Sequence, residues 1–66
     1  MKATVNGEER ELASGATLAS LLAELGAPVS GIAVAKNECV VRRADYASHV
    51  LADGDRIEII KAVAGG

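Results

Sequence analysis

The sequence predicts an α+β fold, in which a mixed sheet of four to five strands carries one main helix on one of its faces. Three observations predict it. Apolar and polar residues alternate at 2–6 and again at 56–61, as they do in half-buried strands. Leucines recur at helical spacing between residues 18 and 25. A chain of 66 residues is long enough for only one domain with a thin core.

The first two strands are expected to form a hairpin. Residues 2–6 place Ala3 and Val5 on one face, and Asn6-Gly7 follows directly. Both turn residues tolerate the positive φ of a type I′ turn, so this dipeptide is a strong hairpin signal. The return strand is expected at residues 10–13, with Leu12 pointing toward the core.

One helix should follow the hairpin. Thr17 is a plausible N-cap, because its hydroxyl can accept from backbone N–H groups that the first helical turn leaves unpaired. Gly26 stands where a left-handed C′ residue belongs, and Pro28 prevents the helix from continuing. The apolar stripe between these signals consists of Leu18, Leu21, Leu22 and Leu25.

Two further strands are expected after the helix. Residues 31–35 form a continuous apolar run that is typical of a strand covered on both faces or partly exposed. Residues 36–38 are polar and should turn the chain into a short strand at 39–41. Residues 42–48 are also polar, and they predict a turn or a single helical turn around Tyr46.

The chain is then expected to return to the core before its last strand. Val50 and Leu51 should both pack on the core, and Asp53-Gly54-Asp55 should form a turn. In the last strand, residues 56–61, Ile57 and Ile59 would point inward. Ile60 would lie on the opposite face, and it should either break the alternation or be exposed beside Val63.

The predicted order β-β-α-β-β-β restricts the topology. A right-handed crossover favours a final strand that is parallel to the first and lies in the middle of the sheet. That arrangement is the β-grasp fold. We therefore expect a β-grasp domain at residues 1–61, followed by a flexible C-terminal tail at residues 62–66 that ends in Gly-Gly.

Composition excludes several classes of protein. A single Cys cannot form an intramolecular disulfide or build a zinc or iron–sulfur site, so no metal site is expected. No apolar run approaches the ~18 residues needed to span a bilayer, and the start lacks the apolar region of a signal peptide. Seven basic residues against nine acidic ones do not indicate nucleic-acid binding. We expect a cytoplasmic protein with no membrane or nucleic-acid partner.

The last five residues suit a different kind of chemistry. The segment 62–66 can reach roughly 17 Å when extended, at ~3.3–3.6 Å per residue. Two glycines are narrow enough to enter a slot, and no side chain crowds the carboxylate of the second. A frayed end would have the same composition. The functional interpretation is a carboxylate that is activated in another protein's active site.

Three motifs resemble those of the ThiS family, the ubiquitin-like β-grasp sulfur carriers of thiamin biosynthesis. They are Val5-Asn6-Gly7, the run Asp-Gly-Asp-Arg-Ile-Glu-Ile at 53–59, and Gly65-Gly66. The resemblance covers the whole chain. Family members often carry Val-Pro-Arg where this sequence has Val41-Arg42-Arg43. That departure affects the local turn geometry and not the chemistry of the tail.

The resemblance implies a function centred on Gly66. An ATP-dependent adenylyltransferase of the ubiquitin-activating type would convert its carboxylate to an acyl-adenylate. Sulfur from a cysteine desulfurase persulfide, or from another donor, would then yield a thiocarboxylate for thiazole synthase. Gly65, Ala64 and Val63 would serve in tail recognition. The chain itself would be a protein co-substrate without catalytic side chains or a bound cofactor, and ATP and magnesium would be used by the activating partner.

Other residues have an ordinary interpretation beside a functional one. Ile60 is a candidate docking residue for the activating enzyme, or an ordinary edge of the core. Arg42 and Arg43 could add a basic docking patch, although adjacent arginines in a turn are usually a solvated loop. Cys39 is expected to be a small half-buried hydrophobe. His49 is expected to be a packing or surface residue.

Two alternative functions stay open at this point. One is a sulfur carrier for molybdopterin synthesis or another sulfur pathway, which would share the fold and the Gly-Gly end. The other is a β-grasp interaction module of the TGS type, which is normally joined to a larger enzyme and needs no free terminal glycine. A stand-alone enzyme is disfavoured, because the sequence presents no nucleophile–base pair or carboxylate pair.

Overall fold

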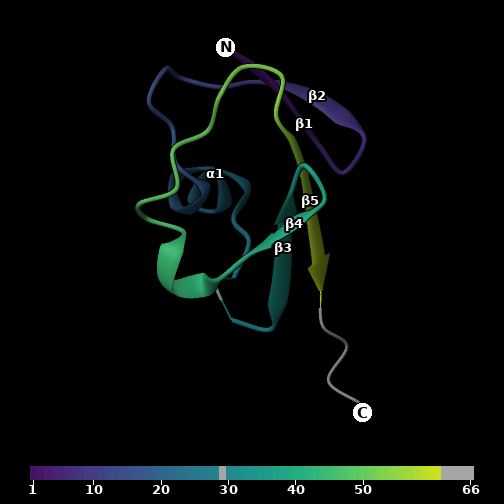
Figure 1. The fold of residues 1–66 in the computed structure, drawn as a ribbon, viewed down its shortest axis with the longest axis vertical. Helices are drawn as coiled ribbons and strands as arrows, with labels where there is room; N and C mark the ends of the chain where they lie inside the picture. The colour runs from purple at the N-terminus through teal and green to yellow at the C-terminus, as the bar shows by residue number, and fades with distance from the viewer. Residues whose placement is uncertain (29, 62–66) are drawn as a thin grey trace.

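A computed structural model describes residues 1–28 and 30–61 of the chain. The predicted tail, with Val63, Ala64, Gly65 and Gly66, lies outside the described residues. Figure 1 shows the arrangement of the elements. They are β1 (Lys2–Val5), β2 (Glu8–Glu11), α1 (Leu18–Leu25), β3 (Ile32–Lys36), β4 (Cys39–Val41), the 3-10 helix η1 (Arg43–Asp45) and β5 (Arg56–Lys61).

The five strands form one mixed sheet in the order β2-β1-β5-β3-β4 (Figure 1). The last strand, β5, is parallel to β1 and antiparallel to β3, and it lies between them. The helix α1 lies to one side of the sheet. The predicted α+β class, the central position of the last strand and its direction are therefore confirmed.

The first hairpin differs from the prediction in the position of its second strand. Asn6 and Gly7 both adopt positive φ, at 50° and 83°, and form a two-residue turn. Such a turn forces pairing to resume at once, so Val5 pairs with Glu8 and β2 spans Glu8–Glu11 instead of residues 10–13. Leu12 follows the strand and is buried, as expected.

The helix begins and ends at the predicted residues. Thr17 Oγ1 accepts from the Ser20 backbone N–H at 3.1 Å, and Ser20 Oγ accepts from the Thr17 N–H at 2.8 Å. This reciprocal pair satisfies two donors at the helix start. Gly26 ends the helix in the left-handed conformation with φ of 68°.

The core lies between α1 and the sheet. Of the predicted leucine stripe, three members are fully buried and Leu25 is partly buried. The buried apolar side chains are Ala3, Val5, Leu12, Leu18, Leu21, Leu22, Val34, Val41, Tyr46, Leu51 and Ile57. Ile59 packs against this cluster as a partly buried residue.

The second hairpin uses two non-glycine residues in the left-handed region. Asn37 and Glu38 have φ of 50° and 72°, and they join Lys36 to its partner Cys39. Cys39 is exposed, so the expected half-buried position is wrong. The reason is that β4 is a three-residue strand at the edge of the sheet.

The connection between β4 and β5 packs along the start of the helix. It contains η1, and Tyr46 directly after it is buried, which confirms the predicted helical turn. Leu51 is buried, but Val50 is 58% exposed, so its predicted burial is wrong. Val50 forms an antiparallel bridge with Thr17, and neighbouring residues of an extended segment point to opposite sides.

Within the described part of the chain, no helix has the length and apolar character that crossing a membrane requires.

Candidate functional site

The end of β5 is the point from which residues 62–66 follow. The strand is paired with β1 on one side and with β3 on the other. Its last residue, Lys61, still pairs with Ile32 of β3. The predicted tail is thus attached to the central strand of the sheet, so contacts that hold the end of β5 also hold the origin of the tail.

The start of β5 is anchored by the buried carboxylate of Asp55. It accepts from the Ala52 N–H at 2.7 Å and from the Asn37 side-chain amide at 3.1 Å. The Lys36 ammonium lies 3.7 Å away. Burial alone would raise the pKa of Asp55, but the hydrogen bonds from Ala52 and Asn37 and the positive charge of Lys36 together lower it below its usual value.

Asp53, the other aspartate of this turn, makes fewer contacts than Asp55. It is exposed, and its Oδ1 accepts from the Lys2 backbone N–H at 2.7 Å. The Gly54 N–H donates to the Lys2 carbonyl at 2.7 Å. The turn that the sequence marks as a family motif is therefore a structural device that places the start of β5 beside β1.

Two asparagine side chains extend the backbone pairing of β5. Asn37 Oδ1 accepts from the Arg56 N–H at 2.9 Å, at the start of the strand. Asn6 Oδ1 accepts from the Ile59 N–H at 2.8 Å, close to its end. The sequence pattern predicts both asparagines as turn residues only. The pattern that indicates their shared role is that Asn stands at the first turn position of both the β1–β2 and the β3–β4 hairpin.

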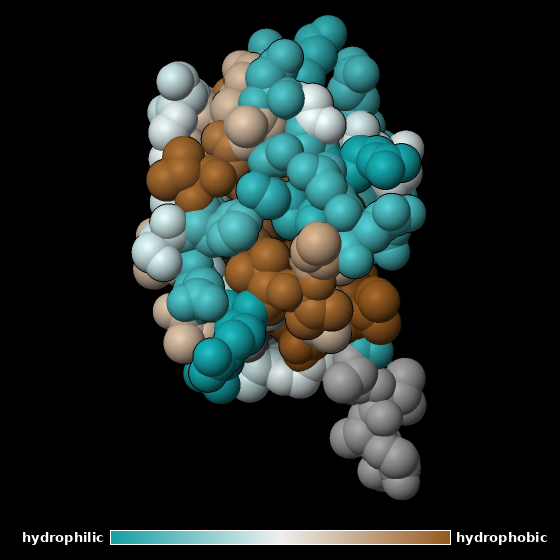
Figure 2. Space-filling model, viewed as in Figure 1, coloured by the Kyte–Doolittle hydropathy of each residue, from teal (hydrophilic) through white to brown (hydrophobic). Residues whose placement is uncertain are grey.

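The sheet face opposite the helix carries an apolar patch near the end of β5. We call it the open-face patch, and it consists of Ala33, Ala35, Val40 and Ile60. Ile60 pairs with Ala33, and Ala35 pairs with Val40. Ile60 is 56% exposed and Val40 is 77% exposed. Figure 2 shows apolar surface where β4 and the end of β5 lie in this view. The predicted exposure of Ile60 is confirmed.

The two candidate arginines, Arg42 and Arg43, follow β4 directly and lie next to the open-face patch in the β3–β4 register. Arg42 follows β4 in extended conformation, and its register position is the one opposite Ala33. Arg43 begins η1, and both arginines are exposed. Their register therefore places positive charge at the same end of the sheet as Ile60. Their proposed contact with a partner stays a prediction.

His49 is half-buried and lies beside the helix start, where its carbonyl accepts from the Leu18 N–H at 3.1 Å. Its Nε2 is buried and has no hydrogen-bond partner among the described residues. Within residues 1–28 and 30–61, no group of three or more His, Cys, Asp or Glu side chains is arranged to hold a metal ion.

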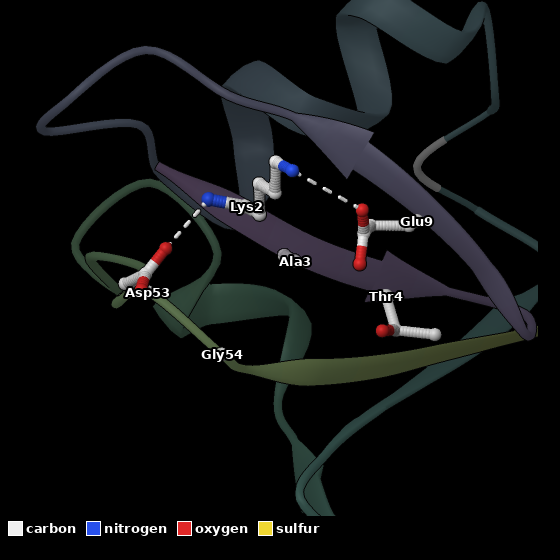
Figure 3. Close-up of a pocket in the computed structure, with 6 residues that line it drawn as sticks. All are labelled: Lys2, Ala3, Thr4, Glu9, Asp53 and Gly54. Atoms are coloured by element: carbon white, nitrogen blue, oxygen red, sulfur yellow. Dashed lines mark hydrogen bonds and ion pairs between the residues drawn. The ribbon is translucent and has the colours of Figure 1, made fainter.

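A shallow hollow of about 140 Å³ lies on the side of the sheet near the start of β1 (Figure 3). It contains an ion pair between Lys2 and Glu9 at 3.5 Å. Because Thr4, in its wall, pairs with Arg56 at the start of β5, the hollow lies at the opposite end of that strand from Lys61. It is not part of the candidate site.

Comparison with known proteins decides the family. Residues 3–66 match the model of the ThiS family. The chain belongs to the ThiS family. This membership confirms the predicted resemblance to the ThiS family and favours it over the molybdopterin carrier and the TGS-type module.

Relatives of similar length support the assignment. This ThiS-family chain is 35% identical to the sulfur carrier protein ThiS of Escherichia coli K12, and the match covers all of both chains. It is 37% identical over 62 residues to ThiS of Thermus thermophilus, covering 94% of this chain and 95% of that one. It is also 39% identical to a thiazole synthase of Paramagnetospirillum magneticum, of whose length it spans one fifth (20%).

A solved structure confirms the ubiquitin-like β-grasp fold. The crystal structure of the thiamine biosynthesis protein ThiS from Geobacter metallireducens superposes on this ThiS-family chain with a TM-score of 0.86. The match covers 100% of both chains at 29% identity. The solution structure of a thiamine biosynthesis protein from the same organism gives a TM-score of 0.79 and is covered over 88% of its length.

Proposed function

We propose that this chain carries sulfur as a thiocarboxylate on Gly66 and delivers it for synthesis of the thiazole ring of thiamine. The observation that carries the proposal is the position of β5. The strand is held on both sides in the middle of the sheet and leads through Lys61 to the segment 62–66, which contains Gly65-Gly66. Within that segment, Gly65-Gly66 is the only motif suited to entering a narrow active site.

The chemistry follows from the weakness of a carboxylate as an electrophile. In the proposed first step, a carboxylate oxygen of Gly66 attacks the α-phosphate of ATP and pyrophosphate leaves. In the second step, a persulfide sulfur from a cysteine desulfurase or another donor attacks the acyl carbon and AMP leaves. A thiol then attacks the donor's cysteine sulfur in the resulting acyl disulfide, so that the S–S bond breaks, the thiocarboxylate leaves and the donor cysteine remains in a disulfide with that thiol. Gly65, Ala64 and Val63 would be the residues that the activating enzyme recognises.

The proposal treats this chain as a co-substrate. An adenylyltransferase of the ubiquitin-activating type would supply the catalytic groups and would use ATP and magnesium in the cytoplasm, and this chain would bind no cofactor of its own. The role of the fold would be to present a recognition surface and an accessible terminus.

The open-face patch is the surface that we assign to the activating enzyme. Its exposed member Ile60 lies on β5, the strand that leads to Gly66, so an enzyme bound at the patch would have the terminus within reach. Arg42 and Arg43 add positive charge beside it, which suits an acidic rim on the partner. Ile60 is the member of the patch that is nearest in sequence to the tail.

Thiazole synthase is the proposed acceptor of the sulfur. Two relatives that carry this name, from Paramagnetospirillum magneticum and Magnetococcus marinus, contain a segment that is 39% identical to the whole of this chain. A polypeptide named for the acceptor that also contains a carrier-like segment supports a direct transfer between the two.

The first step can be tested by ATP–pyrophosphate exchange. The 66-residue chain, an adenylyltransferase of the stated type, magnesium and labelled pyrophosphate are mixed, and label in ATP is measured. We expect exchange that depends on this chain and is abolished when Gly66 is deleted. Exchange that continues without Gly66 would contradict adenylation at that residue.

A further inference from the structure

We propose that Asn6 is a positioning residue for the sulfur-carrying segment, because its side chain fixes the last part of β5 at the point from which that segment follows. This inference rests on the proposed function and deepens it. Asn6 lies in the first hairpin turn, 53 residues before Ile59 in the sequence, yet the two are hydrogen-bonded.

The side-chain carbonyl of Asn6 replaces a backbone carbonyl that β1 does not present to β5. β1 and β5 pair through Val5 and Ile57, and the Asn6 N–H donates to the Ile57 carbonyl at 2.9 Å. A longer β1 would offer its next backbone carbonyl to β5. The chain instead turns away at Asn6, where φ is 50°. Oδ1 of Asn6 takes the place of that carbonyl and accepts from the Ile59 N–H at 2.8 Å.

The two sides of β5 differ at this end of the strand. On the β3 side, pairing continues through Ile59, Ile60 and Lys61. On the β1 side, strand pairing stops at Ile57, and the Asn6 side chain then bonds the N–H of Ile59. A strand that is held on one side only opens more easily than one held on both. The bond therefore limits the motion of Ile60 and Lys61, which carry the docking side chain and the origin of the tail.

The chain provides a matched control in Asn37. It has the same φ of 50°, occupies the same position in the second hairpin turn, and accepts from a backbone N–H of β5 at 2.9 Å. That N–H belongs to Arg56, at the other end of the strand. Asn37 also donates to Asp55, so its removal should cost at least as much stability as the removal of Asn6.

Glycine separates the turn conformation from the hydrogen bond. Asn6→Gly and Asn37→Gly both keep a residue that tolerates positive φ, and both remove the side-chain acceptor. Asn6→Asp restores an acceptor oxygen in a residue that also tolerates this conformation. The three variants and the wild type are compared in amide hydrogen exchange and in steady-state adenylation by the activating enzyme, at a temperature where all are folded.

We expect Asn6→Gly to speed amide exchange at Ile59 and Ile60 by about tenfold relative to Leu21 in the helix. The same variant should lower kcat/KM for adenylation by about fivefold, which corresponds to the loss of one hydrogen bond. Asn37→Gly should leave kcat/KM within about twofold of the wild type, although this variant should be no more stable than Asn6→Gly. Asn6→Asp should recover most of both losses.

Two results would overturn the inference. The first is an equal loss of kcat/KM in the two glycine variants, which would attribute the loss to general destabilisation. The second is unchanged exchange at Ile59 in Asn6→Gly. Because the exchange measurement needs no partner enzyme, it judges the positioning role even if the wild-type chain is not adenylated, a result that would count against the proposed function itself.

Discussion

The side-chain amide of Asn37 donates to Oδ1 of Asp55 at 3.1 Å, and this contact joins the β3–β4 turn to the Asp-Gly-Asp turn before β5. The two residues are 18 positions apart in the sequence. Asn37 also accepts from the Arg56 N–H, so one side chain bonds both the turn and the first residue of the strand. The start of β5 is therefore fixed by side chains as well as by backbone pairing.

Removal of the Asp55 carboxylate should destabilise the protein. Asp55→Ala leaves the Ala52 N–H and the Asn37 amide without their acceptor, and we expect a loss of about 2–3 kcal/mol in the free energy of unfolding. Urea denaturation monitored by circular dichroism measures it. Asp53→Ala, which removes one exposed hydrogen bond from the same turn, should cost about 1 kcal/mol or less. Equal losses in the two variants would contradict the structural role of Asp55.

The same carboxylate predicts an acid-dependent loss of stability. The pKa of Asp55 is lowered in the folded state, so the unfolded chain binds more protons near its own pKa of about 3.9. The stabilisation is thus fully present above that value and is lost as pH falls through the folded pKa. An NMR titration of the side-chain carboxyl should give a midpoint below about 3.9. A midpoint above it would show that burial outweighs the hydrogen bonds.

The residue patterns predicted most of the fold because local signals and the global arrangement agree. The alternation of apolar and polar residues predicted β1 and β5, and the leucine spacing between Thr17 and Gly26 predicted the helix. Bounds were less accurate where turn geometry decides them, as in β2, which starts directly after Gly7. The side-chain hydrogen bonds of Asn6 and Asn37 could not be predicted, because they join turns to a strand that is distant in the sequence.

The buried Nε2 atom of His49 allows a test of the packing beside the helix. A buried polar atom without a partner costs roughly 1–3 kcal/mol, and Nε2 has none among the described residues. His49→Phe keeps a ring of similar shape and removes that atom. We expect the melting temperature to rise by about 4 °C, as for a gain of somewhat less than 1 kcal/mol in a domain of this size.

His49→Gln is the control for that substitution, because it retains buried polar atoms and should give no increase in melting temperature. Differential scanning calorimetry compares the three proteins. A lower melting temperature for His49→Phe than for the wild type would show that the ring does not fit and would contradict the expectation.

The docking role of the open-face patch predicts a selective loss of binding. Ile60→Asp places a charge in the exposed apolar patch, and we expect the Kd for the activating enzyme to rise about tenfold or more, as measured by titration calorimetry. Val50→Asp is the matched control, since Val50 is 58% exposed against 56% for Ile60 but lies in the β4–β5 connection. An equal rise in Kd for both variants, or unfolding of Ile60→Asp, would contradict the assignment.

The exposed positions of Val50 and Cys39 show where single residues are hardest to predict. An apolar residue in an irregular segment can point either way, and the bridge to Thr17 decides the direction of Val50. Cys39 is exposed because β4 ends the sheet, a fact that depends on the order of all five strands. For the candidate site, the exposure of Ile60 was predicted because strict alternation places it opposite Ile57 and Ile59.

The mass of the intact chain after sulfur transfer shows whether Gly66 carries the sulfur. The 66-residue chain is incubated with ATP, magnesium, the adenylyltransferase and a persulfide donor, and is then weighed by mass spectrometry. We expect a gain equal to the replacement of one oxygen atom by one sulfur atom, located in the C-terminal peptide and abolished by deletion of Gly66. No gain with a partner that is active on its own carrier, or a gain that persists without Gly66, would contradict it.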